Sequence, residues 1–198
     1  TMLLRALGYS TNADIFKAFG MIETVKLKSL DMEKYAGATI VEDVVDVSTG
    51  EIFFEGGIEI TQDVVDELLE SKVKEIAVVS GNRDFTSMLL LNTMGKDPAK
   101  NTEEALEIVY QLLRSSEPPN LETAQKFIER IFFSPKKYDL GEVGRYRLNQ
   151  QFNLNVPVED TVLTMDDIIQ VVRFLIDMRK GDRGIDDIDH LGNRRVKT

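Results

Sequence analysis

The chain has 198 residues, of which 42% are hydrophobic and 29% charged, and its formal net charge is -10. This composition is typical of a soluble globular protein of one domain or two small ones, and it excludes an intrinsically disordered chain. The lack of cysteine excludes disulfides and thiolate metal sites, and no run is apolar enough for a membrane span or a signal peptide, so the expected compartment is the cytoplasm.

The charge is distributed unevenly along the chain. Residues 1–95 hold eight Lys and Arg against sixteen Asp and Glu, whereas residues 96–198 hold sixteen against eighteen. Residues 130–151 are locally basic. The acidic total argues against indiscriminate nucleic-acid binding, so any contact with a polyanion is expected in the C-terminal half. An ordinary solvated surface would carry the same cluster, and the charges alone do not separate the two interpretations.

The first predicted element is a short helix over residues 11–19. Thr11 stands three residues before Asp14, which is the spacing of a capping box, and apolar residues follow at helical spacing.

The next region predicts a small meander of short strands with one helix. β-branched and aromatic runs alternate there with Gly- and Ser-containing turns. The predicted strands cover residues 39–47, 51–54, 58–60 and 76–79. Thr61 predicts the N-cap of a helix over residues 61–70. Residues 20–85 are therefore predicted to form a compact, acidic, β-rich inserted module.

The remainder predicts mostly helix. Apolar stripes at helical spacing predict one helix that ends before Pro118 and a second that ends at Ser134. Thr164 and Asp167 have capping-box spacing ahead of a third stripe, which ends at Gly181. The overall prediction is an α+β fold.

Residues 132–149 interleave aromatic and basic side chains. This mixture suits a surface that meets a phosphate backbone, where cations supply salt-sensitive affinity. The candidate contacts are Lys136, Lys137, Arg145 and Arg147. The same segment also fits a join between two helices with its phenylalanines in the core, and the two interpretations are compatible.

The tail over residues 186–196 is the most polar motif. Its potential metal donors are Asp186, Asp187, Asp189 and His190. Neighbouring residues on an extended segment point to alternate sides, and the chain has no other histidine, so the residues alone favour a self-paired loop with Arg194 and Arg195 over a metal site. The chain contains neither a Gly-x-Ser-x-Gly motif nor a phosphate-binding glycine loop, and no complete enzyme site is predicted.

Three motifs in order resemble the bacterial DNA-directed RNA polymerase β subunit. They are LRALGY at residues 4–9, the set FFS, YDL and VGR between residues 132 and 145, and IDDIDHLGNRRV at residues 185–196. The resemblance implies that residues 1–19 and 86–198 form the lobe, or β2 domain, that residues 20–85 are a lineage-variable insertion, and that the chain is a piece of a much longer one.

The resemblance also implies a function in transcription. The lobe would form one wall of the DNA cleft and contact downstream duplex and the non-template strand. The implied DNA-contacting residues of the tail are Ile188, Asp189, Gly192, Arg194 and Arg195. In such a nucleotidyltransferase the catalytic magnesium belongs to the β′ subunit, so this chain would have no cofactor or catalysis of its own. Its partners would be DNA, β′, α and a sigma factor.

Two alternatives remain open from the residues. The acidic module of residues 20–85 suits a docking site for protein factors. The second alternative is a small metal-dependent hydrolase that uses the tail carboxylates and His190.

Overall fold

The structure is a computed structural model. It describes residues 1–35, 37–45, 50, 52–70, 73–79, 85–115 and 120–184. The chain divides into two compact units, Thr1–Val109 and Tyr110–Thr198. No helix among the described residues is long and apolar enough to cross a membrane.

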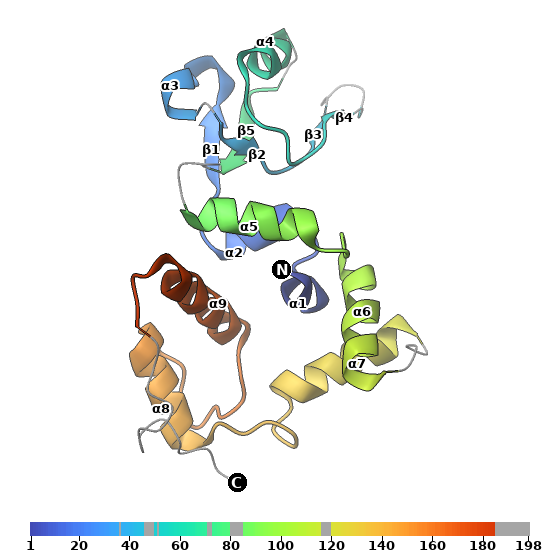
Figure 1. The fold of residues 1–198 in the computed structure, drawn as a ribbon, viewed down its shortest axis with the longest axis vertical. Coiled ribbons are helices and arrows are strands. Elements are labelled where there is room, and N and C mark those ends of the chain that lie inside the picture. The colour runs from blue at the N-terminus through green and yellow to red at the C-terminus, as the bar shows by residue number, and fades with distance from the viewer. Residues whose placement is uncertain are drawn as a thin grey trace. The chain divides into compact units, whose positions relative to one another are not determined.

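Unit 1 combines helices with two small antiparallel sheets (Figure 1). Its elements are α1 (Met2–Ala6), α2 (Asn12–Ala18), β1 (Glu23–Lys26), the 3-10 helix η1 (Leu27–Ser29), α3 (Met32–Tyr35), β2 (Thr39–Ile40), β3 (Val44–Val45), β4 (Ile52–Phe54), α4 (Gln62–Glu70), β5 (Glu75–Val79) and α5 (Phe85–Lys96). The predicted capping box at α2 is confirmed, because the Thr11 side chain accepts from the Asp14 N–H and the Asp14 carboxylate accepts from the Thr11 N–H.

The buried Arg5 joins α1 to two later segments. Its guanidinium donates to the Ser10 carbonyl, to the Asn12 side chain and, at 2.9 Å, to the Lys100 carbonyl. Burial lowers the pKa of Arg5, and nearby carboxylates, of which Asp97 has the largest effect, oppose that shift. The arginine of the LRALGY motif is therefore an internal connection of the polypeptide.

The strand order differs from the predicted meander. The three-stranded sheet has the order β1-β5-β2, so that the last strand in sequence pairs with both others. The predicted strand over residues 39–47 is interrupted: β2 pairs with β5, whereas β3 pairs with β4 in a second sheet. Pairing partners distant in sequence decide this order, and no local pattern encodes them.

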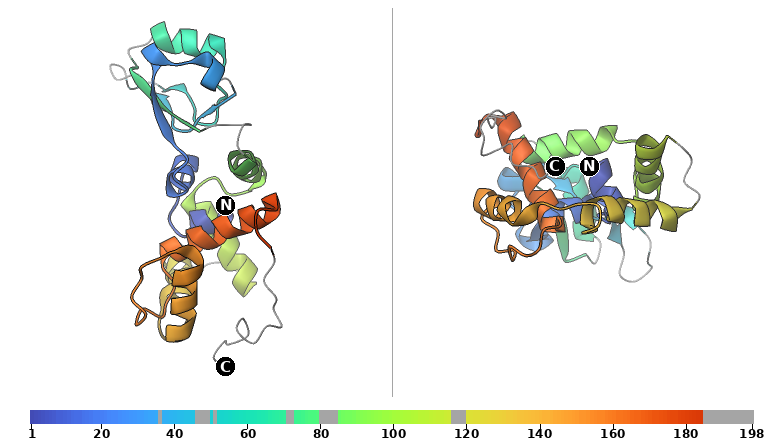
Figure 2. Two further views of the ribbon diagram at one scale, coloured as in Figure 1. Left: turned by 90° about the vertical axis from the view of Figure 1, so that its left-hand side faces the viewer. Right: turned by 90° about the horizontal axis from the view of Figure 1, so that it is seen from below.

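One hydrophobic core lies under these strands. Its buried residues are Val25, Leu27, Ala38, Ile40, Val44, Ile60, Val65, Leu68, Ile76 and Val78. They come from both sheets, from η1 and from the apolar face of α4, which packs on η1. Figure 1 and the left view of Figure 2 show α3 and α4 at one end of β1. Residues 58–60 lie beside β2 through backbone hydrogen bonds but form only an isolated bridge there.

Unit 2 is helical in its described part. The helix α6 (Thr102–Arg114) runs into it and is followed by α7 (Leu121–Phe133), α8 (Gly141–Phe152) and α9 (Met165–Lys180). Edge-to-face ring contacts join α6 to α7, through Tyr110 and Phe127, and α8 to α9, through Phe152 and Phe174. The predicted capping box at Thr164 and the glycine end at Gly181 are confirmed, and so is the predicted α+β fold class.

Packing selects only part of each predicted stripe. In α6, Ala105 and Val109 of the predicted stripe are buried, Leu112 and Leu113 of the stripe are exposed, and Leu106 and Tyr110 are buried although they lie outside it. Periodicity identifies an apolar stripe, but which side of a broad stripe is covered depends on the neighbouring element.

Candidate nucleic-acid interface

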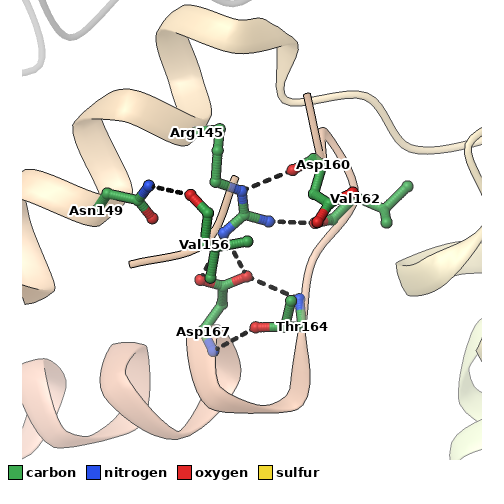
Figure 3. Close-up of polar contacts among 7 residues, drawn as sticks. All are labelled: Arg145, Asn149, Val156, Asp160, Val162, Thr164 and Asp167. Carbon is green, nitrogen blue, oxygen red and sulfur yellow. Dashed lines mark hydrogen bonds and ion pairs between the residues drawn. The ribbon is translucent and has the colours of Figure 1, made fainter. Parts of the chain in front are cut away.

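An arginine at the centre of α8 organises the region that the sequence nominates for DNA contact. The Arg145 side chain is 0% exposed. Its Nη1 lies 2.8 Å from Oδ1 and 2.7 Å from Oδ2 of Asp167, on α9. Its Nε donates to the Asp160 carbonyl at 2.7 Å, and its Nη2 donates to the Val162 carbonyl (Figure 3). One guanidinium thus holds α8, the loop after it and the start of α9 together.

Asp167 has two functions in this arrangement. Its Oδ2 also accepts from the Thr164 N–H at 2.7 Å, and its own N–H donates to the Thr164 hydroxyl at 3.2 Å. The carboxylate therefore caps α9 and neutralises Arg145 at the same time. Because each buried charge has several hydrogen bonds, the cost of removing the pair from water is offset.

The loop over residues 153–164 is fixed at further points. Asn149 donates from its side chain to the Val156 carbonyl at 2.6 Å, and the Leu140 N–H donates to the Thr161 carbonyl at 2.7 Å. Asn153 ends α8 in the left-handed region, at φ 53°. These contacts make the surface of α8 and of the preceding turn a preformed one.

The structure corrects the role predicted for Arg145. A DNA phosphate needs a solvent-accessible cation, and this guanidinium is buried and already donates from all three of its nitrogens to protein acceptors. Its role is internal, and Arg145 is removed from the predicted DNA-contacting set.

The other described candidates lie on the surface. The turn between α7 and α8 places Lys136 and Lys137 in solvent, and the Ser134 carbonyl closes it by accepting from the N–H groups of Lys137, at 3.0 Å, and Tyr138, at 2.9 Å. Arg147 is exposed on α8, two residues beyond Arg145, and Tyr146 beside it is also exposed. Two residues along a helix correspond to a rotation of about 200°, which separates the buried from the exposed arginine.

Tyr138 ends this turn in a half-buried position. Burial raises the pKa of its phenol, and the negative charge of Asp167 raises it further. A tyrosine is neutral at physiological pH even without this shift, so Tyr138 adds no negative charge beside the two lysines.

The predicted tail contacts lie outside the described residues. They are Ile188, Asp189, Gly192, Arg194 and Arg195, and the alternative metal donors Asp186, Asp187 and His190 lie there too. Within the ranges that the structure describes, no group of three or more His, Asp or Glu side chains could hold a metal ion.

Comparison with known proteins identifies the family. The family described as RNA polymerase Rpb2, domain 2 matches residues 64–197. The chain belongs to this family. The resemblance to the bacterial RNA polymerase β subunit, predicted from three motifs, is confirmed.

Relatives of the chain include DNA-directed RNA polymerase β subunits. Those of Flavobacterium psychrophilum, Porphyromonas gingivalis and Bacteroides fragilis are 39%, 37% and 36% identical to it across the whole chain. The chain spans 17% of the length of each of these relatives.

Several residues of this candidate region could not be predicted from the sequence. Asp167 is recognisable from sequence as a capping residue, but no local signal connects it with Arg145, 22 residues away. The carbonyls of Asp160 and Val162 carry no sequence signal, because every residue has one. Tyr146, by contrast, could have been nominated from its position beside Arg147 among the interleaved aromatic and basic residues.

Proposed function

We propose that this chain works as part of the β subunit of a DNA-directed RNA polymerase, where it contacts DNA through the turn at Lys136 and Lys137 and the exposed side of α8. The observation that carries the proposal is the exposure of these two lysines on a turn whose following helix is anchored by the buried Arg145–Asp167 pair.

The chemistry of this surface suits a phosphate backbone read without regard to sequence. Lysine ammonium groups neutralise phosphates as point charges and release counterions. Arg147 adds a third cation, and the exposed ring of Tyr146 offers a face on which an unpaired base can stack. Single-stranded DNA beside a duplex, as in an open transcription bubble, would meet both kinds of group.

The tail extends the proposal to base recognition. The Asp189 carboxylate would accept from the N–H edge of an unstacked guanine of the non-template strand, and Arg194 would contact base or backbone. Ile188 would give an apolar wall, Gly192 would allow close approach, and Arg195 would add a phosphate contact. These assignments rest on the family resemblance.

No catalytic group is assigned to this chain. In the proposal the catalytic magnesium is held by β′, and transcription requires assembly with β′, α and a sigma factor. The domain contributes positioning of DNA in the cleft, and its loss should weaken DNA engagement before it affects the chemistry of nucleotide addition.

The proposed DNA contact by Lys136 and Lys137 can be tested through the salt dependence of oligonucleotide binding. We expect the Lys136→Ala/Lys137→Ala variant to bind a fluorescent single-stranded oligonucleotide more weakly than the unmodified chain in an anisotropy titration. Because each single-strand phosphate contact contributes about 0.7 to the slope of log affinity against log salt, losing two contacts should reduce that slope by about 1.4.

A matched variant separates local contact from net charge. Lys26 and Lys28 are also exposed, and Lys26→Ala/Lys28→Ala changes the net charge of the chain equally but lies in the acidic unit 1. The proposal predicts an almost unchanged slope for this control. Equal loss in both variants would show that total charge governs binding and would refute the assigned surface. The same pairs placed in an assembled polymerase then test open-complex stability.

A further inference from the structure

The proposed DNA surface leaves the acidic module unexplained. Residues 35–71 contain ten Asp and Glu and no Lys, Arg or His. Nucleic acid and anionic membranes are repelled by such a stretch. Three apolar side chains are nevertheless exposed there on the β3–β4 hairpin: Val45 is 40%, Ile52 56% and Phe53 42% exposed.

A register shift accompanies the exposure of these three side chains. Val44 pairs with Phe54, and both face the core, but the next pair is Val45 with Ile52, so that Phe53 has no partner of its own. In an unshifted ladder Val45 would oppose Phe53, and Ile52 would lie on the core side. The additional residue instead places Ile52 opposite Val45, on the outer side. The shift therefore leaves Val45, Ile52 and Phe53 all exposed, whereas Val44 and Phe54 pack toward the core.

Carboxylates border this hairpin patch (Val45, Ile52 and Phe53). Glu42, Asp43 and Glu55 stand beside the strands in sequence, and all three are exposed. Asp43 accepts from the Gly56 N–H at 2.7 Å, which ties the two ends of the hairpin together. Along the sequence the patch is thus an apolar centre with an acidic rim, and the Asp43–Gly56 hydrogen bond joins the two strands where the described hairpin begins and ends.

We propose that the hairpin patch docks a protein segment that presents apolar side chains flanked by lysine or arginine. The apolar centre supplies contact area that excludes water, and the rim selects for positive charge. A second copy of this chain is a poor occupant, because it carries a net charge of -10 and the same acidic rim. The inference is independent of DNA contact, since its residues lie outside residues 130–151.

Synthetic peptides can test this on the intact chain. The probe is a labelled amphipathic peptide of Leu and Lys, compared with one in which Glu replaces Lys and one in which Ala replaces Leu. We expect only the Leu/Lys peptide to bind in anisotropy titrations, and its addition to shift the amide resonances of residues 44–45 and 52–55 in the isotopically labelled chain.

Single substitutions test whether the hairpin patch is where the peptide binds. Phe53→Ser should weaken the Leu/Lys peptide about tenfold, as removal of an aromatic anchor commonly does. Ile52→Ser provides a second variant if Phe53→Ser does not fold. Leu69→Ser is the matched control, because Leu69 is 49% exposed on α4 in the same acidic stretch; its effect should be under twofold.

Four outcomes would overturn the proposal. They are absence of binding by the Leu/Lys peptide, equal binding of the Ala peptide, equal losses in the Phe53 and Leu69 variants, and concentration-dependent self-association in sedimentation that Phe53→Ser abolishes. Either of the first two would show that the proposed kind of partner is not recognised, and the third would show that the hairpin patch is not the binding site. The last would assign the patch to a second copy of the chain.

Discussion

At the scale of single residues, Arg145 and Arg147 show that position decides what a side chain does. Both belong to the same basic motif, and the amino-acid composition does not distinguish them. The helical rotation between them places Arg145 against the Asp167 carboxylate and Arg147 in solvent. A phosphate contact can therefore be proposed for Arg147, whereas Arg145 stabilises the surface from beneath.

The internal role of Arg145 predicts that its replacement will destabilise the protein. We expect Arg145→Ala to lower the free energy of unfolding by about 3–5 kcal/mol, because it leaves the Asp167 carboxylate buried without its cation. Urea denaturation followed by circular dichroism measures this. Arg147→Ala is the control and should stay within about 0.5 kcal/mol of the unmodified chain. A stable Arg145→Ala protein with impaired DNA binding would restore the surface role that the burial excludes.

At the scale of elements, local sequence signals predicted where helices begin more accurately than they predicted the strands. The two capping boxes, at Thr11 and Thr164, are present as their spacing predicts. The β-branched run over residues 39–47 predicts one strand, but it is divided between two sheets. A cap needs four consecutive residues, whereas a strand needs a partner that lies elsewhere in the chain.

Two glycines provide a test at the scale of elements, because replacement by alanine is expected to destabilise the protein at one of them and to stabilise it at the other. A Cβ on Gly56 would lie 2.5 Å from the Val41 carbonyl oxygen, so Gly56→Ala must displace the backbone beside the hairpin and should destabilise the protein by at least about 1 kcal/mol. A Cβ on Gly95, in α5, would meet nothing within 4 Å. Gly95→Ala should stabilise by about 0.5–1 kcal/mol. Thermal unfolding compares them, and a tolerated Gly56→Ala would contradict the close approach of the two backbone segments.

At the scale of the whole molecule, the chain divides into two compact units, and each contains buried apolar residues. The core beneath the strands draws all its members from residues 25–78, within unit 1. The interior of unit 2 includes Ala124, Ile128, Ile169 and Ile176. The predicted division into a lobe of residues 1–19 and 86–198 and an insertion of residues 20–85 stays a prediction, with the continuous core of residues 25–78 in its favour.

Because the core under the strands is confined to residues 25–78, we expect a mutation in it to act locally. Ile40 is fully buried on β2, and Ile40→Ala should cost about 2–5 kcal/mol within unit 1. Hydrogen exchange followed by mass spectrometry should then show faster exchange in β1, β2 and β5 but unchanged protection in α8 and α9. An equal increase in α8 and α9 would show that the two units unfold together.

The α+β class, the family, the two capped helices and the basic character of the turn at residues 136–137 could be predicted from the amino-acid sequence. Each of these depends on residues close together in the chain or on a motif read in order. The position of β5 between β1 and β2 and the burial of Arg145 against Asp167 became visible only in the folded chain, because they depend on residues far apart in sequence. The pairing of Ile52 with Val45 joins residues only seven apart, but its register shift is likewise selected by the free energy of the packed chain and not by any local pattern.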